Sequence, residues 1–151
     1  MSNRRESREL VLQALYSKEI SDNDTATIFT GMIKPKLETR EELTFAEKLL
    51  YRTIEHRVDC DHHIIKQLKN YELHRLALID KLILRMAIVE LLHFEDIPIK
   101  VTINEAIDLA KKYSTARSGY FVNGILDAIA KELREQGLIR KTGRGQIEVT
   151  L

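Results

Sequence analysis

The segment from Leu76 to Leu92 constrains the fold most, because it is apolar on nearly every side of a helix. Only Asp80, Lys81, Arg85 and Glu90 interrupt it. A helix turns by about 100° per residue, so the first three of these fall within an arc of about 140° and Glu90 lies outside it. A helix with such a narrow polar strip is expected to be central and covered by other helices.

Apolar residues recur at helical spacing along most of the rest of the chain. The 151 residues include only six Gly and two Pro, which disfavours a turn-rich β-sandwich. The sequence therefore predicts an all-α fold of about seven helices. The first is expected over about residues 5–20, the central one over about 76–93 and the last over about 120–135.

Local signals predict where several of these helices begin and end. Thr44 is a candidate cap for the third helix. Thr102 and Glu105 have the spacing of a capping box, so we expect the sixth helix to begin there. Residues 114–119 are small and read as a loop that carries Arg117. Gly124 falls inside the last helix, where it costs about 1 kcal/mol relative to Ala, and close packing of a neighbour would explain it.

The length suits one domain, which we expect over residues 1–137, followed by a loosely attached tail over 138–151. The single cysteine, Cys60, excludes an intramolecular disulfide. The first residues do not resemble a secretory signal, and no stretch approaches the roughly 20 apolar residues of a membrane span. We therefore expect a soluble cytoplasmic protein with no membrane partner.

The net charge is only +1, yet the cations are gathered in places. Arg4, Arg5 and Arg8 share a face of the first helix, and arginine suits phosphate because its planar fork presents several donors. A second group combines charges for a backbone with rings for unstacked bases. It consists of Lys111, Lys112 and Arg117 with Tyr113, Tyr120 and Phe121. Solvated charges and core aromatics are the alternative interpretation of both groups.

Residues 56–63 include His56, Asp59, Cys60, Asp61, His62 and His63, a dense run of possible metal ligands. The run lacks a distant matching ligand pair, so it does not fit a structural zinc site, and a helix junction is the favoured interpretation. No phosphate-binding loop, dinucleotide turn or nucleophile elbow occurs. We expect no catalytic residue, cofactor or metal. A metal-dependent hydrolase built on this run is the alternative.

Several blocks of the sequence resemble the NusB family of bacterial transcription antitermination factors. The first is Arg4-Arg5-(x2)-Arg8 leading into Gln13-Ala14-Leu15-Tyr16. The second runs from Ile79-Asp80-Lys81 to Glu90-Leu91. The strongest pair is Ile103-Asn104-Glu105-Ala106-Ile107 and Phe121-Val122-Asn123-Gly124-Ile125. The blocks follow the family's order over roughly residues 4 to 130.

The resemblance implies two packed helical bundles and no enzymatic activity. It implies binding of single-stranded boxA RNA together with NusE, a small-subunit ribosomal protein, and association with the elongating RNA polymerase to suppress termination, notably in ribosomal RNA operons. The RNA-binding residues it implies are Arg4, Arg5, Arg8, Phe121 and Asn123, with Lys111, Arg117 and Tyr120 as neighbours.

The resemblance also implies that Tyr16 and Asp80 face NusE. An alternative function is a NusB-like helper for a separate ribosomal RNA methyltransferase, because a related domain precedes the catalytic domain in such enzymes. The sequence leaves open whether the chain is a monomer or a homodimer.

Overall fold

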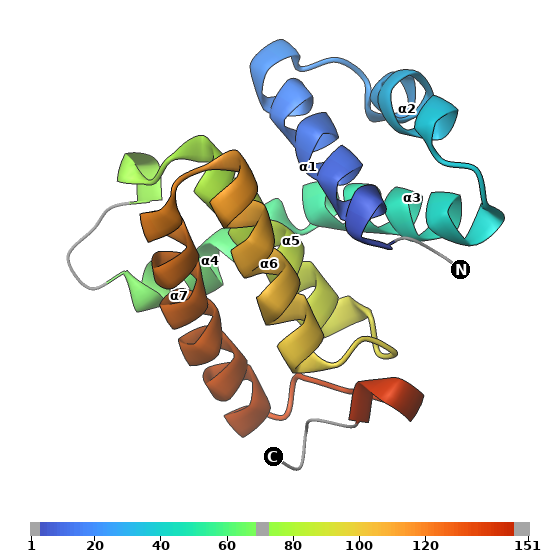
Figure 1. Ribbon diagram of the computed structural model, residues 1–151. Coiled ribbons are helices and arrows are strands. Elements are labelled where there is room, and N and C mark those ends of the chain that lie inside the picture. Colours follow the sequence, from blue (N-terminus) through green and yellow to red (C-terminus); the bar gives the residue numbers. More distant parts are fainter. Residues whose placement is uncertain (1–3, 69–72, 147–151) are drawn as a thin grey trace. The chain divides into compact units, whose positions relative to one another are not determined.

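The computed structural model describes residues 4–68 and 73–146, and within these ranges the protein has seven α-helices and no strand. This confirms the predicted all-α class (Figure 1). None of the helices in the described ranges is long and apolar enough to cross a membrane. The chain divides into two compact units, residues 1–56 and 57–151, each described by itself below.

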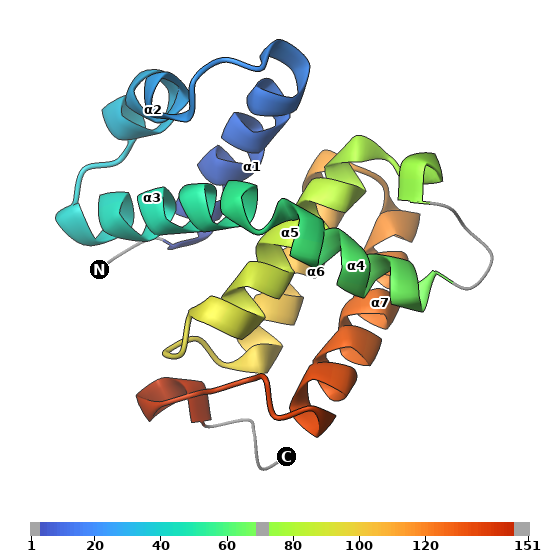
Figure 2. The same cartoon turned by 180° about the vertical axis from the view of Figure 1, so that it is seen from behind.

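Unit 1 is built from α1 (Arg4–Ser21) and α3 (Arg40–Glu55), which pack against each other. The short helix α2 (Thr25–Ile28) continues into a wider π-helical turn, η1 (Phe29–Ile33), and a 3-10 turn, η2 (Lys34–Lys36). Figure 2 shows α2 and these turns beside α1 in the same unit. The largest fully buried side chains of this unit are Leu12, Ile33, Leu49 and Leu50.

The start of α3 corrects the expected cap at Thr44. The N-cap is Thr39, whose Oγ1 accepts from the Glu42 backbone N–H at 3.1 Å. Glu42 Oε1 accepts in return from the Thr39 backbone N–H at 3.1 Å. This is the reciprocal capping box, and it satisfies two donors that a helix start otherwise leaves unpaired. Thr44 therefore lies inside the first turns of the helix.

Unit 2 consists of α4 (Arg57–Gln67), the 3-10 turn η3 (Leu73–Arg75), α5 (Leu78–His93), α6 (Ile99–Tyr113) and α7 (Ala116–Glu135). Helix α5 packs against α4, α6 and α7, and most of its residues are buried. It is the central helix that the sequence predicts. Part of its polar strip is paired with a neighbouring helix: Arg85 donates from Nε and Nη2 to the two carboxylate oxygens of Asp61 on α4, at 2.8 and 3.0 Å.

The start of α6 is four residues earlier than expected. Its N-cap is Pro98, and the Thr102 N–H already donates to the Pro98 carbonyl at 3.2 Å. Thr102 is buried, and its hydroxyl donates to Glu90 Oε1 at 3.0 Å. The buried carboxylate of Glu90 therefore uses the hydroxyl that the sequence assigns to a cap, because an unpaired acceptor in the core is costly.

Helix α7 also begins earlier than expected, and the predicted loop over 114–119 is mostly its first turn. Its N-cap is Thr115, whose side chain accepts from the Ser118 N–H at 3.1 Å. Gly124 has an open surrounding, because a β-carbon built there meets nothing within 4 Å. Close packing is therefore not the reason for a glycine at this position.

The described part of the tail, residues 138–146, is attached to the end of α5, in contrast to the loose attachment expected from the sequence. Lys141 is buried, and its Nζ donates to the carbonyls of Glu90 and Phe94 at 3.1 and 2.8 Å. The Thr142 N–H donates to the Glu95 carbonyl at 2.9 Å, before a 3-10 turn, η4 (Gly143–Gln146). Residues 147–151 lie outside the described residues.

Candidate nucleic-acid interface

The basic face expected at the amino terminus lies on the first turns of α1. Arg4 and Arg8 lie over the Phe45 ring of α3, with their guanidinium carbons 4.8 and 5.2 Å from the ring centroid. Arg8 is only 4% exposed, whereas Arg5 is exposed. Cation–π contacts of this kind hold the arginines against the helix pair. Arg8 thus has a structural role in unit 1 that the sequence did not predict, and Arg5 is the most exposed of the three, ahead of the half-buried Arg4.

The turn between α6 and α7 is held by a small hydrogen-bonded network. Ser118 is buried and donates from Oγ to Asp80 Oδ2 of α5 at 2.9 Å. The hydroxyls of Ser114 and Thr115 lie 2.9 and 3.1 Å from the same Oγ. With the Thr115 cap, this network fixes the first turn of α7 against α5. The turn is therefore a rigid platform for the side chains that project from it.

The side chains on this platform include four of the six residues of the second predicted basic and aromatic group. Tyr120 is 82% exposed, and Arg117, Lys111 and Asn123 are exposed as well, whereas Phe121 is half-buried. Residues 117, 120 and 121 fall on one side of α7, because helical spacings of three and four residues share a face. The first turn of α7 contains no acidic residue. The structure thus gathers Lys111, Arg117, Tyr120, Phe121 and Asn123 at one end of the α6–α7 hairpin, here called the hairpin surface.

The two residues expected to face a partner protein lie in different units and have different environments. Tyr16 on α1 is 43% exposed, and one helical turn later Ile20 is 67% exposed. Asp80 on α5 is buried, with Oδ2 engaged by Ser118. Its Oδ1 has no hydrogen-bond partner within the ranges that the structure describes. Ile20 was missed by the sequence analysis, although its spacing of four from Tyr16 could have indicated it.

Two buried residues that support the hairpin surface were not predicted. Ser118 looks like an ordinary loop serine in the sequence, and only the proximity of Asp80 gives it a function in the network. Gly119 is buried beneath the side chain of Lys111, whose Cγ would lie 3.1 Å from a β-carbon built on Gly119. Sequence spacing carries no signal for either contact, because both join different helices.

Packing explains two members of the run of possible metal ligands. Asp61 pairs with Arg85, and the Cys60 thiol is buried and donates to the Arg85 carbonyl at 3.7 Å. Burial, and next the charge of Asp61, raise the pKa of Cys60 to about 12. Such a thiol is almost never a thiolate at neutral pH, so it is a poor nucleophile. Within the described ranges, no three His, Cys, Asp or Glu side chains cluster as a metal site would require.

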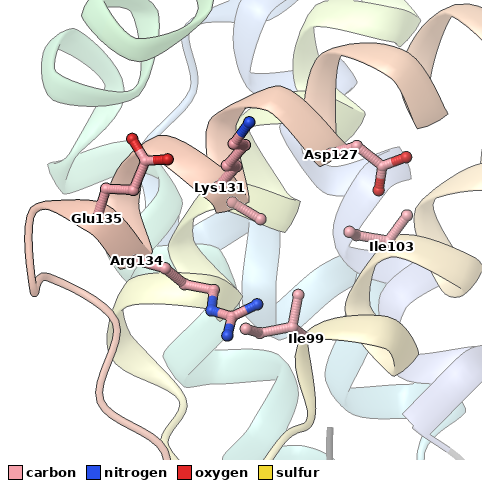
Figure 3. A pocket seen from close by; sticks show the side chains of 7 residues that line it. Ile99, Ile103, Asp127, Lys131, Arg134 and Glu135 are labelled. Atoms are coloured by element: carbon pink, nitrogen blue, oxygen red, sulfur yellow. The ribbon is translucent and has the colours of Figure 1, made fainter. Parts of the chain in front are cut away.

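A surface groove of about 510 Å³ lies at the other end of the hairpin, between the start of α6 and the end of α7 (Figure 3). Ile99 and Ile103 line one side of it, and Asp127, Lys131, Arg134 and Glu135 line the other. Its two acidic and two basic side chains balance, so this groove has none of the positive excess that nucleic acid requires.

Comparison with known proteins places the chain in one family. The sequence model of the NusB family matches residues 5–131. The chain is 46% identical over 148 residues to the transcription antitermination protein NusB of Salinibacter ruber, covering 97% of this chain and 92% of that protein.

Solved structures agree with the sequence comparison. T. maritima NusB matches with a TM-score of 0.77 and 39% identity over 87% of this chain and 92% of that one. An antitermination factor in a crystal structure of NusB and NusE with double-stranded RNA matches with a TM-score of 0.77 and 25% identity, over 85% and 96% of the two chains. The described fold and these matches together show that the chain belongs to the NusB family.

Proposed function

We propose that this protein is a transcription antitermination factor that binds single-stranded boxA RNA together with NusE and then joins the RNA polymerase elongation complex. It acts in the cytoplasm, and by binding alone, without catalysing a reaction. Support comes from the family membership and from a related chain whose crystal structure contains NusE and RNA. The proposed effect is suppression of termination, notably in ribosomal RNA operons.

The observation that carries the proposal is the exposed Tyr120 ring on the rigid hairpin surface. The Tyr120 side chain is 82% exposed and lies near Arg117 in the sequence, so it does not contribute to a hydrophobic core. A ring of this kind stacks on an unstacked base, with about 1–3 kcal/mol per base, while neighbouring cations contact the phosphates. Lys111 and Arg117 supply those cations, and Asn123 and Phe121 lie beside them on α7 for contacts with base edges and faces.

In unit 1, we assign RNA phosphate contacts to Arg5 and Arg4. We assign to Arg8 a structural role, the cation–π contact with Phe45. We assign NusE binding to the exposed pair Tyr16 and Ile20 on α1. Asp80 is buried, so we assign it to NusE binding only indirectly, through the Ser118 hydrogen bond that fixes the start of α7.

The test is a titration of boxA-like RNA and of a scrambled RNA of the same length, with and without NusE. Phosphate contacts are assigned to four cations: Arg4, Arg5, Lys111 and Arg117. At about −0.7 for each contact on single strands, they predict a slope of log K against log salt near −3. Binding that shows no preference for the boxA-like RNA even with NusE present contradicts the proposal. Sedimentation of the free protein in the same buffer distinguishes a monomer from a homodimer.

Matched variants locate the RNA surface. We expect Tyr120→Ala and Lys111→Ala to weaken binding of the boxA-like RNA and to leave the helical circular dichroism unchanged. Lys100→Ala is the control, because Lys100 is an exposed lysine at the opposite end of α6. If Tyr120→Ala and Lys111→Ala bind the boxA-like RNA as tightly as Lys100→Ala does, the hairpin surface is not part of the RNA-binding site.

A further inference from the structure

Gly119, in the first turn of α7, lies directly beneath the side chain of Lys111 from α6. A β-carbon built on Gly119 would lie 3.1 Å from Lys111 Cγ and 3.2 Å from Lys111 Cε. It would also lie 3.6 Å from Ile107 Cγ2. The methylene groups of Lys111 therefore run across the bare backbone of Gly119, and Ile107 borders the same space.

The contact is specific to this glycine. Carbon atoms closer than about 3.4 Å are inside ordinary van der Waals contact, so any side chain at position 119 displaces the lysine. Gly124, one and a half turns further along α7, meets nothing within 4 Å and serves no such purpose. Gly119 is also buried, although the helix surface around it is exposed at Arg117 and Tyr120.

The platform beneath the lysine is itself fixed. The residue before Gly119 is Ser118, whose hydroxyl donates to buried Asp80, and the helix start is capped by Thr115. Lys111 therefore lies along a rigid helix start, with its Cγ and Cε against the backbone of Gly119, the residue before Tyr120. A lysine side chain that is already restricted by packing loses less rotamer freedom when it binds an anion than one that moves freely in solvent.

We propose that Gly119 is a positioning residue for RNA binding: the missing side chain forms a channel that holds Lys111 in place for a phosphate next to the base stacked on Tyr120. This inference rests on the proposed function and adds to it a residue that touches no RNA. Its effect passes entirely through Lys111, and that distinguishes it from a residue that merely supports the fold.

The experiment is a double-mutant cycle on RNA binding by the full chain with NusE, using Gly119→Gln, Lys111→Ala and the combined variant. Gly119→Gln fills the channel and is expected to weaken binding about threefold to tenfold, as the loss of one phosphate contact would. Lys111→Ala is expected to weaken it by a similar factor and to lower the magnitude of the salt slope by about 0.7. In the Lys111→Ala background, Gly119→Gln is expected to have no further effect.

Two more measurements separate positioning from folding. Gly119→Ala needs only a small displacement of the lysine and should give a smaller loss of affinity with an unchanged or higher melting temperature. Gly124→Ala reports the gain from helix propensity alone, since the space around it is open. In the free protein, ¹³C relaxation of the Lys111 Cε methylene should show increased motion in Gly119→Gln, and this readout does not depend on RNA.

The outcomes distinguish the two proposals. If Lys111→Ala weakens boxA binding but Gly119→Gln binds as the parent does, the positioning role is overturned and the proposed function stands. The same holds if Gly119→Gln weakens binding equally with and without Lys111. If the parent protein binds boxA-like and scrambled RNA alike in the presence of NusE, both proposals fail.

Discussion

Replacement of Asp61 by Asn tests the central packing of unit 2. Asp61 Oδ1 and Oδ2 accept from Arg85 Nε and Nη2 at 2.8 and 3.0 Å, in a bidentate pair between α4 and α5. The Arg85 side chain is 8% exposed and that of Asp61 is 19% exposed. Asn keeps the shape of the side chain but removes its charge, so the buried guanidinium loses the charge of its bidentate partner.

Breaking a buried pair by changing one partner costs about 3–5 kcal/mol. Because water still reaches part of Asp61, we expect the lower end, about 3 kcal/mol. That is a large fraction of the 5–15 kcal/mol that typically separates folded from unfolded domains. Urea unfolding followed by far-ultraviolet circular dichroism measures this change in the free energy of unfolding.

The control is Asp59→Asn, which removes the same charge from an exposed position on the same helix and should cost less than about 1 kcal/mol. Arg85→Met combined with Asp61→Asn should recover much of the lost free energy of unfolding, because neither position of the pair then carries a charge. A loss below about 1 kcal/mol for Asp61→Asn would refute the reasoning, since the pair would then be no stronger than a surface salt bridge.

Three further predictions follow from single sites. Gly124→Ala should raise the free energy of unfolding by about 0.5–1 kcal/mol, because the site is helical and open; calorimetry that shows a lower melting temperature would contradict this. Burial lowers the pKa of Lys141 to about 8, so between pH 8 and about 10.5 the folded state has lost a proton that the unfolded state keeps. Stability relative to Lys141→Met should therefore rise across that window, by at most about 1.4 kcal/mol per pH unit, and a flat difference in urea midpoints would exclude it. Cys60, with its pKa raised to about 12, should react with iodoacetamide at pH 8 at least about a thousandfold more slowly in the folded than in the unfolded protein; mass spectrometry giving rates within tenfold would count against a closed core.

Two pairs of residues with capping-box spacing show what local sequence signals can and cannot predict. Thr39 with Glu42 and Thr102 with Glu105 have the same spacing, and only the second was predicted to start a helix. Only the first pair forms a capping box in the structure. The Thr102 hydroxyl does not cap a helix, because it donates to Glu90 in the core of unit 2. A spacing rule describes the helix alone and contains nothing about a carboxylate twelve residues earlier in the chain.

The expected RNA-binding residues show the same division. Composition and spacing identified the cations of α1 and the aromatic residues around Tyr120. They did not separate exposed Arg5 from Arg8, which shares its helix face but lies against Phe45. Which of two arginines is buried depends on the helix packed opposite, and that information is absent from a periodicity.

By itself, the sequence determined the all-α class, the central position of a helix over about residues 76–93 and the family, because these depend on periodic patterns and ordered motifs that a chain carries along its length. The tertiary structure decided which polar groups meet: Asp80 with Ser118, Lys111 with Gly119, and Lys141 with the carbonyls that end α5. Asp80 and Ser118 are 38 residues apart in the chain, and Lys141 and Phe94 are 47 apart, while Lys111 and Gly119 lie on different helices. The free energy that selects them comes from burying polar groups only where partners exist, which is a property of the packed molecule.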